Sequence, residues 1–175
     1  MKPVALVTGA AGLIGGYLLR SASRWAPDWE VHGVTRAEVD LTDRPQVQRV
    51  WNRYRPDLVI HCAALSRTGL CEQDPALARR INVEATRSLA DLAKDVPFIF
   101  LSTDQVFDGA KGRYAETDAV HPLNVYGHTK TEAEPLVLEH PTHAVVRIAL
   151  TAGTSPTGDR SFVEDMLRAA AKGTR

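Results

Sequence analysis

Short apolar runs alternate with longer stretches of helical periodicity along this chain. The runs are four to eight residues long, carry few charges and are rich in aliphatic and aromatic residues. Such runs are typical of strands that are covered on both faces in a parallel sheet. We predict strands over residues 3–7, 29–34, 57–64, 98–101 and 144–150.

Between these runs, apolar residues recur at the spacing that places them on one face of a helix. We predict helices over residues 12–24, 44–54, 75–94, 123–139 and 160–172, and an irregular stretch over 108–121. Thr42 or Asp43 would cap the second helix. Asn82 falls on the apolar stripe of the third, so either it faces solvent or it is a buried amide with a structural hydrogen-bonding role. We favour the buried amide.

The regular alternation of strand and helix predicts an α/β fold built on a doubly wound parallel sheet with right-handed crossovers. A chain of 175 residues is long enough for one domain with a substantial core and too short for two. We therefore treat residues 1–175 as a single domain.

Charge and cysteine content narrow the range of partners and compartments. Lys plus Arg and Asp plus Glu both number 21, so no basic field points to nucleic acid or to an anionic membrane. Any anion must be held locally. Two cysteines, Cys62 and Cys71, cannot form a disulfide framework, and no run reaches the length of a transmembrane helix or a signal-peptide core. We expect a cytoplasmic protein that binds neither nucleic acid nor membrane, and no metal.

Glycines at positions 9, 12 and 15 lie between the first predicted strand and the first predicted helix. That spacing is a variant of the dinucleotide-binding pattern, in which glycines allow a tight turn, close approach to a pyrophosphate and close packing of helix on strand. We place Gly9, Gly12, Leu13, Ile14 and Gly15 in a cofactor site, and we predict a Rossmann fold.

The end of the second predicted strand indicates which dinucleotide binds. An NAD site usually places Asp or Glu there to meet the adenosine ribose, whereas this chain has Thr35 and Arg36. Arg36 could pair with a 2′-phosphate, helped by the Thr35 hydroxyl, or it could be a solvated surface residue. We predict that NADP(H) is preferred and that NAD(H) is also accepted. Asp40 is either a turn residue or an adenine contact, and we include Asp40 and Leu41 in the site.

Small and hydroxylated residues follow two later strands, at the sheet edge where ligands bind in open α/β folds. Ala63 and Ala64 would let the backbone run beside a cofactor, and Ser102-Thr103-Asp104 follows the fourth strand. His61 lies within an apolar run, and we interpret it as a core imidazole or a supporting residue, not a catalytic one.

Tyr126 and Lys130 stand four residues apart near the start of the fourth predicted helix, so both side chains project from one face. A phenol has an ordinary pKa of about 10, which a neighbouring cation would lower. Tyr126 would then be a proton donor or acceptor. Tyr-x-x-x-Lys also occurs by chance in many helices, where the Tyr packs and the Lys is solvated.

The glycine turn, the hydroxyl after a middle strand and the Tyr/Lys pair occur in the order that resembles extended short-chain dehydrogenases/reductases, and within them the dTDP-4-dehydrorhamnose reductase family. The resemblance covers almost the whole chain. It rests on the following segments: residues 8–15, 55–60, Ala63-Ala64, Cys71-Glu72 with Asn82, 102–104, 106–109, 116–118 and 122–130.

The resemblance implies that Tyr126 is the general acid in reduction of a 4-keto sugar nucleotide. It also implies that Lys130 lowers the phenol pKa and binds the nicotinamide ribose, and that Thr103 stabilises the oxyanion. Asp104 and Gln105 would lie near the substrate. Related dehydratases carry a catalytic Glu where this chain has Gln105, which argues against elimination. Thr68-Gly69 replaces the common Val-Asp. The family continues beyond this length, so we expect the C-terminal substrate lobe to be absent from residues 1–175.

Two other functions remain open. Some relatives of this type keep the nucleotide site and the Tyr/Lys pair yet serve as regulatory or partner subunits of another enzyme. An NAD-dependent sugar-nucleotide epimerase is the third interpretation, which Arg36 disfavours. The sequence leaves a homodimer open.

Overall fold

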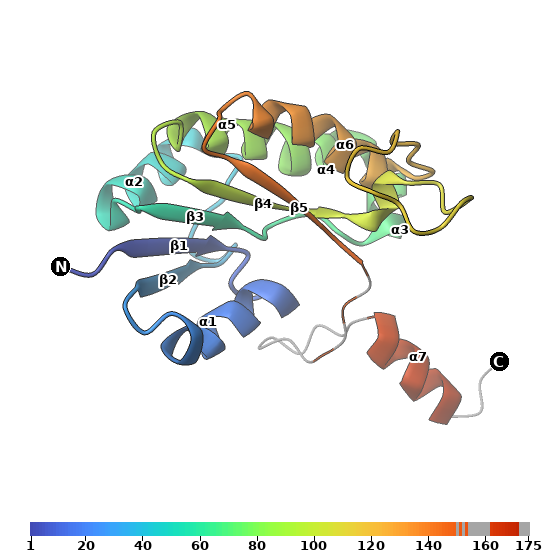
Figure 1. The fold of residues 1–175 in the computed structure, drawn as a ribbon, viewed down its shortest axis with the longest axis horizontal. Coiled ribbons are helices and arrows are strands. Elements are labelled where there is room, and N and C mark those ends of the chain that lie inside the picture. The colour runs from blue at the N-terminus through green and yellow to red at the C-terminus, as the bar shows by residue number, and fades with distance from the viewer. Residues whose placement is uncertain (150, 152, 154–161, 172–175) are drawn as a thin grey trace.

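Five parallel strands form the centre of the computed structural model, which describes residues 1–149, 151, 153 and 162–171. The strands lie in the order β2-β1-β3-β4-β5 (Figure 1). Their bounds are β1 Val4–Thr8, β2 Glu30–Val34, β3 Leu58–His61, β4 Phe98–Thr103 and β5 Ala144–Ile148. The predicted α/β fold with a parallel sheet is confirmed.

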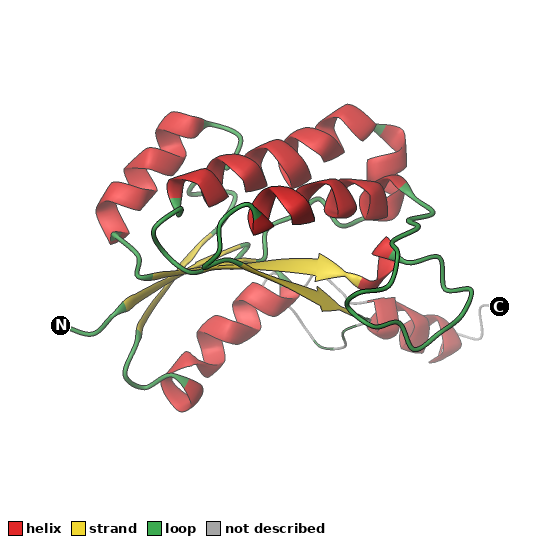
Figure 2. Cartoon of the chain, turned by 45° about the horizontal axis from the view of Figure 1, so that its top comes forward, coloured by secondary structure: helices red, strands yellow, loops and turns green. Residues whose placement is uncertain are grey.

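Helices cover both faces of this sheet, with α1 on one face and α2 to α6 on the other (Figure 2). Their bounds are α1 Leu13–Trp25, α2 Arg44–Tyr54, α3 Thr68–Gln73, α4 Pro75–Arg79, α5 Ala85–Leu92, α6 Val125–Leu138 and α7 Phe162–Ala171. A π-helical segment, Arg80–Glu84, joins α4 to α5, and a short 3₁₀ helix, Asp104–Val106, follows β4. No helix in the described ranges is both long and apolar enough to span a membrane.

Four sequence predictions about these elements need correction. The third strand ends at His61, because the next amides leave the ladder for side-chain acceptors such as the Thr8 hydroxyl, which accepts from the Ala63 amide at 3.2 Å. The helix predicted over 75–94 is interrupted by the π-helical segment. Helix α3 was not predicted from the sequence. The fourth helix begins at Val125 because Asn124 caps it, its side chain accepting from the Gly127 amide at 2.7 Å. The fifth strand, predicted over 144–150, ends at Ile148. Residue 150, and residues 160, 161 and 172 of the last predicted helix, lie outside the described residues.

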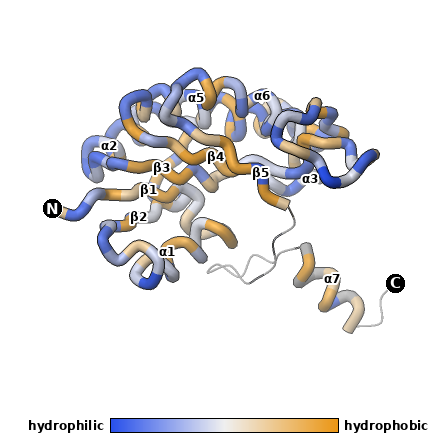
Figure 3. The backbone as a smooth tube through the Cα atoms, viewed as in Figure 1, coloured by the Kyte–Doolittle hydropathy of each residue, from blue (hydrophilic) through white to orange (hydrophobic). Residues whose placement is uncertain are grey.

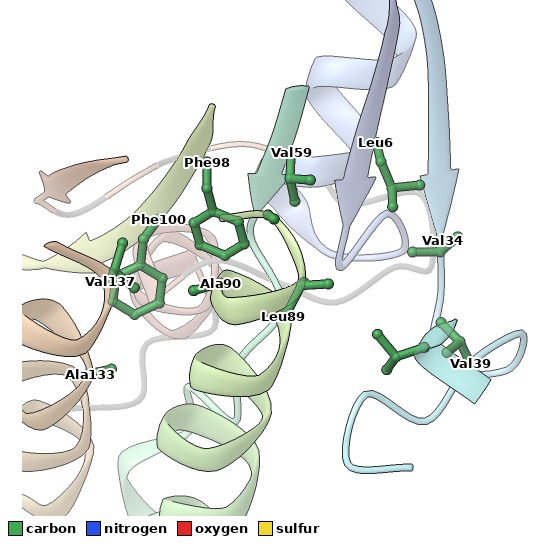
Figure 4. Packing of buried hydrophobic residues seen from close by; sticks show 12 residues of the cluster. Leu6, Val34, Val39, Val59, Leu89, Ala90, Phe98, Phe100, Ala133 and Val137 are labelled. Atoms are coloured by element: carbon green, nitrogen blue, oxygen red, sulfur yellow. The ribbon is translucent and has the colours of Figure 1, made fainter. Parts of the chain in front are cut away.

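The main core lies between the sheet and the helices α2, α5 and α6. Phe98 and Phe100, two residues apart on β4, are fully buried and point to the same face, where they pack near Ala90 and Val137 (Figure 4). Hydrophobic residues predominate along the central strands, while hydrophilic and hydrophobic residues alternate along the helices (Figure 3). This face of the sheet fixes α6, the helix that carries Tyr126 and Lys130.

The strand order creates a switch point at β1. The chain moves from β1 to β2 on one side, then returns past β1 to β3 on the other. Connections that diverge in this way leave a crevice at the carboxyl ends of the strands, where ligands bind in open α/β sheets. The candidate site lies there.

Candidate active site

A single cleft of about 1700 Å³ runs along the carboxyl ends of the strands. The structure brings every residue that the sequence nominated to this cleft. They are Gly9, Gly12, Leu13, Ile14, Gly15, Thr35, Arg36, Asp40, Leu41, Ala63, Ala64, Thr103, Asp104, Gln105, Tyr126 and Lys130. Residues from β1 to α6, far apart in the chain, thus share one surface.

The glycine turn between β1 and α1 has no room for side chains. Gly9 has a φ of +68°, and a Cβ there would lie 2.7 Å from the Ala63 amide nitrogen. A Cβ on Gly15 would lie 2.5 Å from the Gly9 carbonyl oxygen. The first amides of a helix have no partner inside the helix, so those of Leu13 and its neighbours in α1 are available to an anion. The turn suits a pyrophosphate.

The far end of the cleft, after β2, carries charges of both signs. The Thr35 amide and hydroxyl both donate to the Glu38 carboxylate, at 2.8 and 2.9 Å. In this structure the Thr35 hydroxyl proton is thus donated to Glu38, and its help to a 2′-phosphate stays a prediction. Arg36 is exposed and lines the cleft.

Asp40 and Asp43 shape the turn that follows. The Asp40 carboxylate accepts from the Thr42 amide and hydroxyl at 2.9 and 2.8 Å. These bonds lower the pKa of Asp40, with a smaller contribution from Arg36. Asp43 caps α2 by accepting from the Gln46 amide at 3.2 Å. Asp40 is thus a turn residue that also lines the cleft.

His61 is a buried supporting residue, as the sequence indicated. The Thr86 hydroxyl donates to the Asn82 carbonyl at 2.8 Å, so its oxygen must accept from His61 Nε2, 3.0 Å away. His61 Nδ1 then accepts from the Thr8 hydroxyl at 2.7 Å. Burial, with a smaller contribution from Lys130, lowers the pKa of His61 to about 3. The imidazole is neutral and its tautomer is fixed.

Asn82 continues this chain of bonds to α6, and the predicted buried amide is confirmed. Its Oδ1 accepts from the Leu65 amide at 2.8 Å, and its Nδ2 donates to the Leu65 carbonyl and the Thr129 hydroxyl, both at 3.0 Å. The Thr129 hydroxyl donates to the Tyr126 carbonyl at 2.8 Å. Hydrogen bonds therefore connect the glycine turn to the Tyr126 backbone.

Lys130 is 2 % exposed, and its Nζ lies 3.8 Å from the centre of the Phe100 ring. Burial lowers the pKa of Lys130 to about 7, against the opposing effect of Glu134. The amine lines the cleft, so its donors are available to a ligand.

The expectation that Lys130 lowers the pKa of Tyr126 is wrong for this structure. Burial raises the pKa of Tyr126 to about 12, with contributions from Cys71 and Asp104, and only its hydrogen bond with Thr103 opposes the shift. Removing a phenol from water disfavours its charged form, and here that effect is dominant. Tyr126 is a protonated phenol, which is the form that a general acid requires.

Thr103 is 5 % exposed and connects Tyr126 to the turn after β4. Its hydroxyl donates to Asp104 Oδ1 and accepts from the Gln105 amide, both at 3.2 Å. The Gln105 Oε1 in turn accepts from Asn124 Nδ2 at 2.9 Å, which fixes the orientation of the Gln105 amide.

Sequence reasoning missed the polar groups behind the pair. Glu134 accepts hydrogen bonds from Ser102 and Arg147 beneath Lys130. Only its spacing, a further four residues along the helix from Lys130, could have indicated it. Glu72, which the sequence analysis cited only as part of the family resemblance, accepts from the Val125 amide at 2.7 Å.

Several known proteins resemble this chain in sequence and in fold. The family model for the RmlD substrate binding domain matches residues 1–175. The chain is 37% identical to the dTDP-4-dehydrorhamnose reductase of Streptomyces griseus, over 95% of this chain and 55% of that protein. It is 36% identical to methionine adenosyltransferase 2 subunit beta of Danio rerio, over 90% of this chain and 51% of that protein. The chain thus spans about half the length of these curated relatives.

Solved structures show the same fold. The dTDP-4-dehydrorhamnose reductase of Bacillus anthracis in complex with NADP superimposes with a TM-score of 0.88 at 30% identity, covering 98% of this chain and 61% of that one. The UDP-glucose 4-epimerase of Brucella ovis in complex with NAD gives a TM-score of 0.79 at 24% identity, covering 94% and 57%. This second likeness shows the fold alone.

We predict that Asn82→Ala destabilises the protein by at least about 2 kcal/mol, because it leaves the Leu65 amide and carbonyl without their partner. The free energy of unfolding from urea titration measures the loss. Asn52→Ala is the matched control, because Asn52 is exposed and should change stability by less than about 0.5 kcal/mol. Equal losses in the two variants would contradict the structural role of Asn82.

Proposed function

We propose that this chain, which belongs to the RmlD substrate-binding domain family, is the dinucleotide-binding part of an NADP-dependent reductase of 4-keto sugar nucleotides. The observation that carries the proposal is the shared cleft, in which an anion-binding glycine turn faces the same space as Thr103, Tyr126 and Lys130. A turn of this kind alone would suit many nucleotides. The phenol and the buried amine beside it favour proton transfer next to a bound cofactor.

The residues present fit a dinucleotide. A Cβ on Gly9 or Gly15 would fill the turn, which supports close approach of a pyrophosphate to the backbone. The Lys130 amine has available donors at the other end of the cleft, where we place the hydroxyls of the nicotinamide ribose. Arg36, at the adenosine end, would hold the 2′-phosphate.

Side chains of this protein would supply the proton and stabilise the negative charge that develops on the carbonyl oxygen. When bound, the nicotinamide would supply a hydride to the carbonyl carbon of the sugar. Tyr126 would donate its proton to the carbonyl oxygen, so that an alcohol forms and a phenolate remains. The cationic Lys130 would stabilise that phenolate. The Thr103 hydroxyl, whose proton is donated to Asp104 in this structure, would turn it to the carbonyl oxygen as the charge there grows.

Two features favour reduction over the related chemistries. Gln105 supplies an amide where elimination would need a carboxylate, and Asn124 holds that amide in place. Arg36 favours a phosphorylated ribose over the unmodified ribose that an NAD-retaining epimerase would bind.

The substrate's own contacts are a separate proposal. We propose that residues 1–175 form the dinucleotide-binding domain and that a substrate lobe contributed by the remaining length of such proteins holds the sugar nucleotide. Binding energy from that lobe would position the keto group at Tyr126, so residues 1–175 alone should turn over substrate poorly.

A role as a partner subunit is the second candidate. It is favoured by relatives named methionine adenosyltransferase 2 subunit beta, which are 36% to 37% identical over most of this chain. A protein of that kind would bind the cofactor and keep the geometry of the cleft without turnover.

We predict that the chain binds NADPH more tightly than NADH, and that Arg36→Ala weakens NADPH binding by about ten-fold or more, the worth of one charged hydrogen bond. NADH affinity should change little. Fluorescence titration measures both constants, and Arg53→Ala is a control at the far end of α2. Equal affinities of the unmodified chain for the two cofactors would contradict the assignment.

We predict that Tyr126→Phe in the full-length protein lowers kcat by at least about a hundred-fold, since it removes the proton donor. NADPH affinity should stay within a few-fold. Tyr17→Phe is the control, because Tyr17 is 62% exposed and outside the cleft. An unchanged rate for Tyr126→Phe would exclude this phenol as the acid, whereas absence of turnover in the unmodified protein would favour the partner subunit.

A further inference from the structure

Helix α6 presents three functional groups on one face, Tyr126, Lys130 and Glu134, each one turn after the last. The first two line the cleft. Glu134 is not among the residues that line the cleft and is 5 % exposed. A buried carboxylate is costly unless it is paired and hydrogen-bonded, so its partners indicate why it is there.

Glu134 is held by two strands at once. Its Oε1 accepts from the Ser102 hydroxyl at 2.6 Å and from Arg147 Nε at 3.0 Å, and its Oε2 accepts from Arg147 Nη2 at 2.6 Å. Ser102 on β4 and Arg147 on β5 are direct partners in the parallel ladder. The two-point contact with a guanidinium is the geometry of a carboxylate, so the charge on Glu134 is fixed against the sheet below Lys130.

Arg147 has further contacts that hold it in position. Its guanidinium carbon lies 5.1 Å from the centre of the Phe107 ring, and its Nη1 donates to the Glu116 carbonyl at 3.2 Å. The bond to Glu134 raises the pKa of Arg147. The ion pair is thus anchored to the segment that follows β4 as well as to the sheet.

The titratable groups that face Lys130 come from several elements. His61 and Cys62 lie on or just after β3, Tyr126 lies on α6, and Arg147 lies on β5 behind Glu134. Burial holds His61 as a neutral imidazole, raises the pKa of Cys62 to about 12 and that of Tyr126 to about 12. Among the described groups that act on the Lys130 amine, Glu134 is therefore the anion.

We propose that Glu134, clamped by Ser102 and Arg147, is a positioning residue that keeps the buried Lys130 amine protonated at the cleft. The inference deepens the proposed function and rests on it for the role of Lys130 at the cofactor. Glu134 touches no reacting atom. It acts through Lys130, because its negative charge offsets the loss of water around the amine.

Arg147 has the opposite effect in this arrangement. It holds Glu134 in place, but its positive charge partly neutralises the carboxylate that Lys130 senses. Removing Glu134 and removing Arg147 should therefore shift the protonation of Lys130 in opposite directions. If the two substitutions merely loosened the packing of α6, water would reach the Lys130 amine and its pKa would rise in both variants.

The test is an NMR titration of the chain with carbon-13 in its five lysines, in which Lys130→Met assigns the Lys130 signal. We expect Glu134→Gln to lower the Lys130 midpoint by about one pH unit or more, and Arg147→Gln to raise it. Glu132→Gln is the matched control, because Glu132 lies on the same helix but is exposed and pairs with Arg79. Its midpoint should equal that of the unmodified chain.

Equal Lys130 midpoints in the unmodified chain and Glu134→Gln would overturn the proposal, as would shifts of the same sign in the Glu134 and Arg147 variants. Glu134→Asp, which keeps the charge, should stay close to the unmodified midpoint. If Glu134→Gln alone does not fold, the double variant Glu134→Gln/Arg147→Gln, which leaves neither charge unpaired, is compared with Arg147→Gln: we expect a lower Lys130 midpoint in the double variant, and an equal or higher one would overturn the proposal. The titration needs no substrate, so failure of the proposed reductase activity leaves this test intact, and failure here leaves the reductase test intact.

Discussion

Burial of one primary amine is the constraint on which the site depends. Lys130 is almost completely removed from water. The face of the Phe100 ring and the negative charge of Glu134 stabilise its ammonium group in place of that water. Such an arrangement is stable only if helix α6 lies close to β4 and β5. The apolar contacts of Phe100 with α6 and the clamp on Glu134 provide that closeness. The same desolvation keeps Tyr126 protonated, so one packing arrangement sets both groups.

The two ends of the cleft are connected through the protein interior. Hydrogen bonds run from the Thr8 hydroxyl through His61 and Thr86 to Asn82, and from there to Thr129 and the Tyr126 carbonyl. Asn82 also binds the Leu65 amide and carbonyl, so the loop after β3 is tied into the same network. A network that is fully satisfied specifies a single arrangement of its elements. The glycine turn and helix α6 are thereby held in a fixed relation, which a ligand that contacts both of them requires.

Local sequence patterns predicted much of the fold and of the candidate site. The strand positions, the turn at Gly9 to Gly15 and the shared face of Tyr126 and Lys130 depend on neighbours in the chain or on fixed helical spacing, so the sequence could predict them. The Glu134 clamp joins residues 32 positions apart through the register of β4 and β5, which no local pattern encodes. The direction of the Tyr126 pKa shift was missed for a related reason, since the depth of burial depends on the packed fold. The engagement of Thr35 by Glu38 is local, but a turn formed by side chains leaves no periodic signal.

The most direct test of the central claim is a crystal structure of the chain with bound NADPH. We expect Lys130 Nζ to lie within hydrogen-bond distance, about 2.7–3.2 Å, of the hydroxyls of the nicotinamide ribose. The nicotinamide ring should lie beside the Tyr126 phenol, and the pyrophosphate should lie at the glycine turn. A cofactor bound at the glycine turn whose nicotinamide ribose makes no contact with Lys130 would contradict it.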